Sequence, residues 1–126
     1  MTAVQEAQPA PQLVQSTQQS VLVLDTATGQ YVRREMTLVL DPATLAATLD
    51  GQSVALSRRE FAVLSTLMER PGVIRSRMEI EERLYGWQEE VESNAVEVHI
   101  HNLRAKVGRE TIETVRGLGY RVRGAA

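Results

Sequence analysis

Hydrogen-bonding and cationic side chains gather near the end of this 126-residue chain, where their types and spacing suit contact with nucleic acid. Residues 93–108, SNAVEVHIHNLRAKVG, supply Asn, His, Arg and Lys. Asparagine can form two hydrogen bonds with an adenine edge, and Arg and Lys neutralise phosphates. Residues 112–122, IETVRGLGYRV, add Arg116 and Arg121 around two glycines. Such chemistry requires a helix that fits a DNA groove and a hairpin beside it.

The apolar spacing predicts that helix over residues 93–108, with Ser93 as its N-cap. At about 100° per residue, four apolar side chains share one narrow stripe that must be buried: Val96, Ile100, Leu103 and Val107. The opposite face has few of the Glu and Lys pairs of a solvated helix. It carries Asn94, Ala95, Val98, His101, Asn102, Ala105 and Arg109. Short side chains let a helix approach a groove, so this face favours DNA contact, and an ordinary amphipathic surface helix is the alternative.

Residues 112–122 indicate a tight β-hairpin with an arginine at its tip. Residues 112–115 are β-rich, Gly117 and Gly119 bracket the turn, and residues 120–122 return. Glycine permits the positive φ angles that short turns require. We expect Arg116 at the tip to reach the minor groove next to the helix. The alternative is a hairpin that merely closes a sheet and leaves its arginines in solvent.

The distribution of charge supports a nucleic-acid partner better than its sum. The formal net charge is −2, but residues 94–126 hold six basic and three acidic side chains, against eight and thirteen in residues 1–93. The basic excess therefore lies in the segment with the helix and the hairpin, which predicts moderate electrostatic affinity through a few phosphate contacts.

Composition also narrows the class of protein. The absence of cysteine excludes disulfides and thiolate metal sites and suits a reducing compartment. No apolar run is long enough to cross a membrane, and the first twenty residues are polar and Gln-rich, unlike a secretory signal. We therefore expect a cytoplasmic protein that has no membrane partner and no cofactor.

The preceding residues predict a sheet that supports the helix and hairpin. Residues 1–19, rich in Gln, Pro, Ala and Ser, indicate a disordered linker, and residues 20–30 indicate an extra strand or a tail. Strand-like runs follow at 31–33, 36–40, 44–49 and 53–56, separated by Asp41-Pro42 and by the hairpin signal Asp50-Gly51. They favour an antiparallel sheet with one buried face.

Two further helices are predicted between the sheet and residue 93. Ser57 with Glu60, and Ser76 with Glu79, have the spacing of capping boxes. We expect the first helix to end near Arg70 and the second at about residue 85. Their apolar stripes are Phe61, Leu64, Leu67 and Met68 in the first, and Ile80 and Leu84 in the second. Sheet, three helices and hairpin together predict an α+β winged helix-turn-helix domain over residues 31–126.

Two stretches resemble the effector domain of the OmpR/PhoB family of bacterial response regulators: residues 56–77, LSRREFAVLSTLMERPGVIRSR, and residues 84–121 around VESNAVEVHIHNLRAKVG and IETVRGLGYR. The sequence of these stretches is most similar to the QseB/PmrA-type branch of the family. The resemblance implies a winged helix that binds promoter DNA, contacts RNA polymerase and sits in tandem on two half-sites. It also implies a preceding receiver domain. This chain shows no aspartate in the surroundings of a phosphoacceptor, so we expect an excised or stand-alone effector domain.

The resemblance assigns roles residue by residue. Val98 corresponds to a contact with thymine methyl groups, Asn102 to a base-reading position, and His99 to a phosphate contact. Arg104, on the flank of the stripe, corresponds to a phosphate contact or an intramolecular ion pair. The wing residues Thr114 and Tyr120 correspond to backbone contacts, and Arg116 to minor-groove reach. Trp87 matches a phosphate-contacting Trp, with a core anchor as its alternative, and loop 86–92 matches the polymerase contact.

Departures from the family pattern modify these expectations. Some members have arginine at the positions of Asn94, His101 and Asn102, so fewer arginine–guanine bonds are expected here. We predict base contacts from Asn94, Val98, His101 and Asn102 and phosphate contacts from His99, Lys106 and Arg109.

Other chemistry finds less support. His99 and His101 point about 200° apart on a helix and cannot share a metal ion. Glu89, Glu90 and Glu92 lie on a polar stretch with no apolar pocket nearby in sequence, which indicates a solvated or partner surface rather than a catalytic pair. No nucleophile–base pair is present, so we expect no enzyme. The main alternative to a DNA-binding regulator is a winged-helix protein-interaction module that does not bind DNA, as the acidic total charge suggests.

Overall fold

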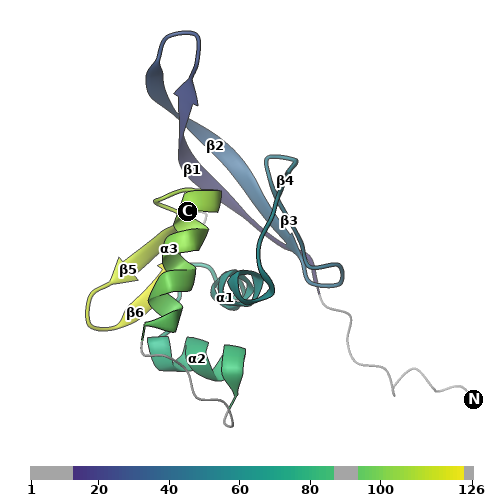
Figure 1. Ribbon diagram of the computed structural model, residues 1–126, viewed down its shortest axis with the longest axis vertical. Helices are drawn as coiled ribbons and strands as arrows, with labels where there is room; N and C mark the ends of the chain where they lie inside the picture. Colours follow the sequence, from purple (N-terminus) through teal and green to yellow (C-terminus); the bar gives the residue numbers. More distant parts are fainter. Residues whose placement is uncertain (1–12, 87–93, 124–126) are drawn as a thin grey trace, which may run out of the picture.

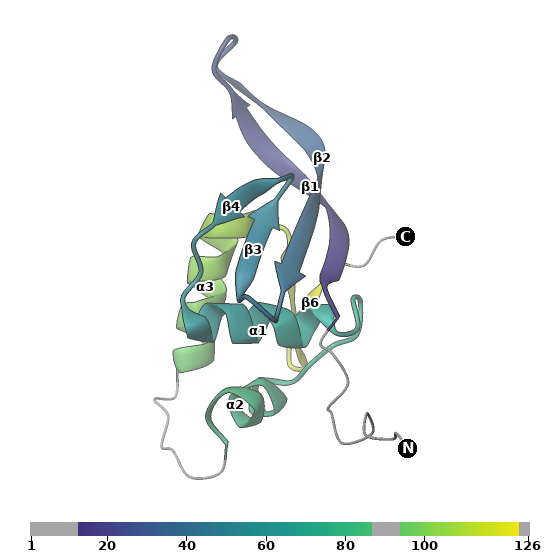
Figure 2. The same cartoon turned by 90° about the vertical axis from the view of Figure 1, so that its right-hand side faces the viewer.

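The computed structural model describes residues 13–86 and 94–123, which form two antiparallel sheets and three helices (Figures 1 and 2). Strands β1 (Gln15–Asp25), β2 (Gln30–Asp41), β3 (Ala46–Leu49) and β4 (Gln52–Val54) lie side by side in sequence order. Helices α1 (Arg58–Met68), α2 (Arg77–Tyr85) and α3 (Ala95–Val107) follow, and then the β5 (Ile112–Val115) and β6 (Gly119–Val122) hairpin. The predicted winged helix-turn-helix architecture is confirmed.

The beginning of β1 differs from the prediction of a linker over residues 1–19. β1 begins at Gln15, and its first three inward-facing positions are polar: Gln15, Thr17 and Gln19. The Gln19 amide donates to the carbonyl of Arg123 (2.9 Å), and the Gln15 amide donates to the carbonyl of Ser65 (3.1 Å). Buried polar groups are tolerated when they are hydrogen-bonded, so this glutamine-rich segment forms a strand without the apolar alternation that predicts one.

Residues 20–30 continue β1 and pass through a turn into β2, so an extra strand, one of the two alternatives, is what forms here. β1 and β2 pair from Gln15–Leu40 to Asp25–Gln30, whereas β3 pairs with β2 only from Leu38 onwards. The far half of the ribbon therefore projects beyond the sheet, at the end of the molecule opposite α2 (Figures 1 and 2). We call residues 20–35 the arm.

The first two helices begin as their capping residues predict. The Ser57 hydroxyl accepts from the backbone N–H of Glu60 (3.0 Å), whose carboxylate accepts from the N–H of Ser57 (2.9 Å). Ser76 and Glu79 form the same reciprocal pair at α2. α1 ends at Met68, two residues before the predicted Arg70, and α2 ends at Tyr85 as predicted. The expected N-cap of α3, Ser93, lies outside the described residues; Asn94 precedes the helix and forms no side-chain cap.

One hydrophobic core joins the sheet, the helices and the hairpin. All four residues of the predicted α3 stripe are buried, together with Leu64 and Leu67 of α1 and Ile80 of α2. Leu38, Leu40 and Ala47 close the core from the sheet. Leu45, expected in the third strand, instead occupies the turn before β3 with a φ of 59° and is exposed. No helix within residues 13–86 and 94–123 has the length and apolar character of a membrane span.

Candidate nucleic-acid interface

The face of α3 opposite its buried stripe is open along its length. Val98, His101, Ala105 and Arg109 are exposed, Asn94 is exposed at the N-cap, and Asn102 is half-buried. A shallow groove of about 490 Å³ runs along this face and is lined by His101, Arg104, Ala105 and Arg109. The predicted base-reading residues thus share one accessible face that carries no acidic side chain except Glu97, which pairs with Arg77 (3.2 Å).

The β5–β6 hairpin is held beside α3 by a third segment of backbone. The N–H of Arg75, between α1 and α2, donates to the carbonyl of Tyr120 (2.8 Å), and the N–H of Tyr120 donates to the carbonyl of Arg75 (2.9 Å). This bridge places Gly119 directly against Arg75. The tip residue Arg116 projects into solvent beyond the bridge, as the prediction of minor-groove reach requires.

Arg104 connects α3 to the β5–β6 hairpin, which forms the wing. Its guanidinium donates twice to the carbonyl of Ile112 (3.1 and 2.8 Å) and once to the hydroxyl of Thr114 (2.8 Å). Of the two expected roles, phosphate contact or intramolecular bonding, the structure has the intramolecular one, although its partners are neutral oxygens. Thr114, predicted to contact the DNA backbone, remains exposed but already accepts this bond.

Lys106 also bonds within the protein. Its ammonium contacts the carboxylate of Glu60 at 2.6 Å, and the Glu60 side chain is only 6 % exposed. Burial by itself raises the pKa of Glu60, but the hydrogen bonds from Lys106 and Ser57 outweigh burial, so the pKa lies below its ordinary value. The predicted phosphate contact by Lys106 would compete with this ion pair.

His99, expected to contact phosphate, lies in a row of contacts between the three helices. Its Nε2 is 3.1 Å from the hydroxyl of Tyr85, and the guanidinium of Arg59 stacks over the Tyr85 ring at 4.2 Å from the centroid. Burial lowers the pKa of His99 and nearby Arg59 lowers it further, while Glu60 acts in the opposite direction. His99 therefore favours its neutral form in the folded protein.

This lowered pKa makes stability depend on pH. The unfolded chain takes up a proton on His99 as the pH falls through about 6.5, before the folded chain does. We expect the free energy of unfolding to fall between about pH 7 and pH 5, and the His99→Gln variant to show a flatter slope in urea titrations. His101→Gln, at an exposed position of the same helix, is the control for the replacement of a histidine by glutamine. Parallel slopes for His99→Gln and wild type would contradict the assignment.

The remaining predicted site residues have mixed outcomes. Tyr120, expected to contact the DNA backbone, is 9 % exposed and belongs to the core cluster, where burial raises the pKa of its phenol. Trp87 and most of the loop at 86–92 lie outside the described residues. Within the described residues, no group of His, Asp and Glu side chains could hold a metal ion.

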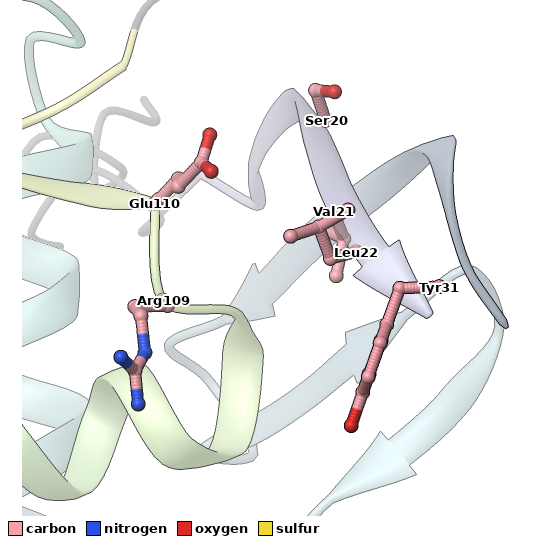
Figure 3. Close-up of a pocket in the computed structure, with 6 residues that line it drawn as sticks. All are labelled: Ser20, Val21, Leu22, Tyr31, Arg109 and Glu110. Carbon is pink, nitrogen blue, oxygen red and sulfur yellow. The ribbon is translucent and has the colours of Figure 1, made fainter. Parts of the chain in front are cut away.

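The contacts that join the arm to the end of α3 were not predicted from the sequence. Arg33 forms a bidentate ion pair with Glu110 (3.0 and 2.8 Å). Val21 packs against Gly108, where an added Cβ would lie 3.3 Å from its side chain. Figure 3 shows the cleft beside this junction, about 360 Å³, lined by Ser20, Val21, Leu22, Tyr31, Arg109 and Glu110. Arg33 and Glu110 are 77 residues apart, and only an alignment of related chains could have linked them.

Several known proteins are similar to this chain. A family model described as "Transcriptional regulatory protein, C terminal" matches residues 51–122. The response regulator protein PmrA of Pseudomonas aeruginosa is 55% identical over 83 residues, which are 66% of this chain and 38% of that protein. The transcriptional regulatory protein QseB of Escherichia coli O157:H7 is 51% identical over 87 residues, 69% of this chain and 40% of that protein. The chain thus spans about two fifths of the length of these relatives.

A solved structure shares the architecture and holds DNA. The Klebsiella pneumoniae RstA DNA-binding domain, in complex with the RstA box, superposes with a TM-score of 0.60 at 32% sequence identity. The match covers 68% of this chain and 90% of that domain. The family model and the relatives agree with the QseB/PmrA-type resemblance of the sequence.

Proposed function

Because this chain belongs to the family of transcriptional regulatory protein C-terminal domains, of the OmpR/PhoB type, we propose that it is the effector domain of a two-component response regulator and binds double-stranded promoter DNA in a sequence-specific way. α3 enters the major groove and the β5–β6 wing contacts the adjacent minor groove. The observation that carries this proposal is the open face of α3, flanked by a wing that the Arg75–Tyr120 bridge and Arg104 hold in place.

The exposed residues divide into base-reading and backbone-contacting sets. Asn94, Val98, His101 and Asn102 read base edges, and Arg109 contacts phosphate. Arg116 enters the minor groove and favours A·T-rich flanks, where the groove is narrow and its potential most negative. Arg104, Lys106 and His99 support the interface from within, since each bonds to another part of the protein. In this proposal their main role is to support the interface, and their predicted DNA contacts contribute less to binding.

Further partners follow from the family resemblance. Two copies occupy tandem half-sites about one helical turn apart. RNA polymerase contacts loop 86–92, which lies almost wholly outside the described residues. The compartment is the bacterial cytoplasm, where promoter DNA is present.

Selection of bound duplexes from a random library tests the function directly. We expect enrichment of a repeated half-site, and an affinity that falls steeply with added salt because each phosphate contact releases counterions. Recovery of no duplex at low salt would overturn the proposal and leave the alternative, a winged-helix module that binds only proteins, which the formal net charge of −2 favours.

Substitutions on the selected duplex separate base reading from backbone contact. Asn102→Ala should relax base preference at one position, at a cost of about 1–3 kcal/mol on the preferred sequence and little on others. Arg116→Ala should weaken binding to all sequences, most where the flank is A·T-rich. The matched control is Arg70→Ala, an exposed arginine after α1, which should bind like wild type. Gel-shift titrations in which Asn102→Ala and Arg116→Ala both behave like this control would refute the assignment.

A further inference from the structure

The projecting arm exposes apolar side chains that nothing in the described chain covers. Leu22, Leu24 and Tyr31 are 50 %, 48 % and 69 % exposed. In the β1–β2 register Leu24 lies opposite Tyr31, and the next pair on the same face is Leu22 opposite Arg33. A two-stranded ribbon is marginally stable in water on its own, and an exposed apolar cluster on a protruding element marks an interaction surface.

Three contacts attach the arm to the rest of the domain at its base. Val21 packs on Gly108, Arg33 pairs with Glu110, and Gln19 bonds to the carbonyl of Arg123. These contacts fix the direction in which the arm leaves the end of α3. Its apolar face is thus presented in a defined place relative to α3, the proposed recognition helix.

That place borders the DNA-contacting face. Arg109 lines both the groove along α3 and the cleft beneath the arm. In Figure 3, Arg109 and Tyr31 extend to the same side, across the cleft from one another, and Glu110 extends to the other side. The wing turn lies at the opposite end of α3, where Gly117 and Leu118 share a cleft with Glu97. Wing and arm therefore flank the two ends of the recognition helix.

The side chains of the arm favour a protein, rather than the DNA backbone, as its binding partner. Residues 20–35 contain two arginines and two acidic residues, and Arg33 is already paired with Glu110. A ribbon that follows phosphates would carry a basic excess. Three half-exposed side chains also offer far less than the roughly 1,200 Å² that a stable interface buries. The partner protein must therefore be held next to the arm by a contact that lies outside the arm.

We propose that the arm contacts a second copy of this chain bound at the adjacent half-site of the same DNA. The inference rests on the proposed function, because the DNA provides that attachment. Two copies on neighbouring half-sites experience a high effective concentration, so a small apolar contact suffices for cooperative binding. The contact is heterologous: the arm of one copy meets a different surface of the next, as a head-to-tail repeat requires.

Duplexes with one and with two selected half-sites test the proposal. The variant with Leu22→Ser and Leu24→Ser should bind a single half-site within about twofold of wild type, whereas its cooperativity on two half-sites should fall by about tenfold. Val73→Ser, which removes an exposed apolar side chain 44 % exposed between α1 and α2, is the matched control and should keep wild-type cooperativity. Thermal unfolding of each variant verifies that the fold is retained.

A cross-link identifies what the arm touches, even where the serine variant folds poorly. The chain has no cysteine, so Leu24→Cys introduces a single thiol for a photoreactive maleimide. We expect a protein–protein cross-link on the two-site duplex and none on the one-site duplex.

Several results would overturn the proposal. Unchanged cooperativity would do so, as would an equal loss of affinity on one and two half-sites or a cross-link to DNA. In those cases the domain still binds DNA and the proposed function stands. If wild type recovers no duplex in the selection, the proposed function fails, and the arm proposal fails with it.

Discussion

The Gly119→Ala variant should lose its cooperative unfolding transition, or unfold tens of degrees below wild type. A Cβ at this position would lie 2.0 Å from the carbonyl oxygen of Arg75 and 2.8 Å from its carbonyl carbon. Both atoms belong to backbone, so no side chain can rotate away. The φ of +149° is itself unfavourable for an L side chain.

Relief of this clash requires that the wing separate from Arg75. The two hydrogen bonds of the Arg75–Tyr120 bridge would break, and Tyr120 and Val122 would leave the core. A loss of about 4 kcal/mol or more is expected for such a collision between backbone atoms. Because small domains are stable by only about 5–15 kcal/mol, much of the population would unfold near physiological temperature.

Gly117→Ala provides the matched control two residues away. Gly117 also has a positive φ, +78°, but a Cβ there would meet no atom within 4 Å. Only the strain of the left-handed conformation remains, about 1–2 kcal/mol. Calorimetry of both variants separates the two effects, since equal losses of Tm would show that conformation, rather than contact with Arg75, determines the need for glycine at residue 119.

Local patterns in the sequence predicted most of the helices and strands, because the residues that determine such an element lie close together in the chain. The capping pairs Ser57–Glu60 and Ser76–Glu79 set the starts of α1 and α2, and the structure has both pairs of reciprocal bonds. The stripe of α3 is buried at all four positions. A pattern that repeats every three or four residues leaves little alternative to an amphipathic helix.

Contacts between distant segments were not predictable in the same way. The buried Gln19 side chain donates a hydrogen bond to the carbonyl of Arg123, 104 residues away. Nothing in a glutamine-rich stretch indicates that partner. Lys106 and His99 have the types and spacing of DNA contacts, yet each bonds within the protein. So does Arg104, for which an intramolecular contact was one of the two expected roles. Their position on the flanks of α3 places them within reach of β5, Glu60 and Tyr85, which only the tertiary packing reveals.

Lys106 illustrates how such an internal contact can be tested. The Lys106→Met variant keeps the aliphatic stem but leaves the Glu60 carboxylate, 6 % exposed, without its cation. The carboxylate retains the backbone N–H of Ser57 as a donor, so we expect a loss of about 2 kcal/mol at pH 7, less than for a fully buried pair. Denaturant titrations measure it.

The pH dependence of this loss identifies Glu60 as its origin. With Lys106 present the folded pKa of Glu60 is lowered, so the stabilisation is complete above the unfolded value near pH 4.5 and disappears as the pH falls through the folded pKa. The gap between Lys106→Met and wild type should therefore close in acid.

An exposed ion pair on the wing gives the control for this experiment. Arg121 is 37 % exposed, as is Lys106, but its partner Glu113 is 39 % exposed. The cations are thus matched, and only the burial of the carboxylate differs. Arg121→Met should cost much less than Lys106→Met, since water replaces the lost partner. If the two variants lose the same free energy at pH 7, burial of Glu60 does not determine the strength of its pair with Lys106. If Lys106→Met loses more, and only above the pKa of Glu60, the lysine stabilises the fold through that carboxylate.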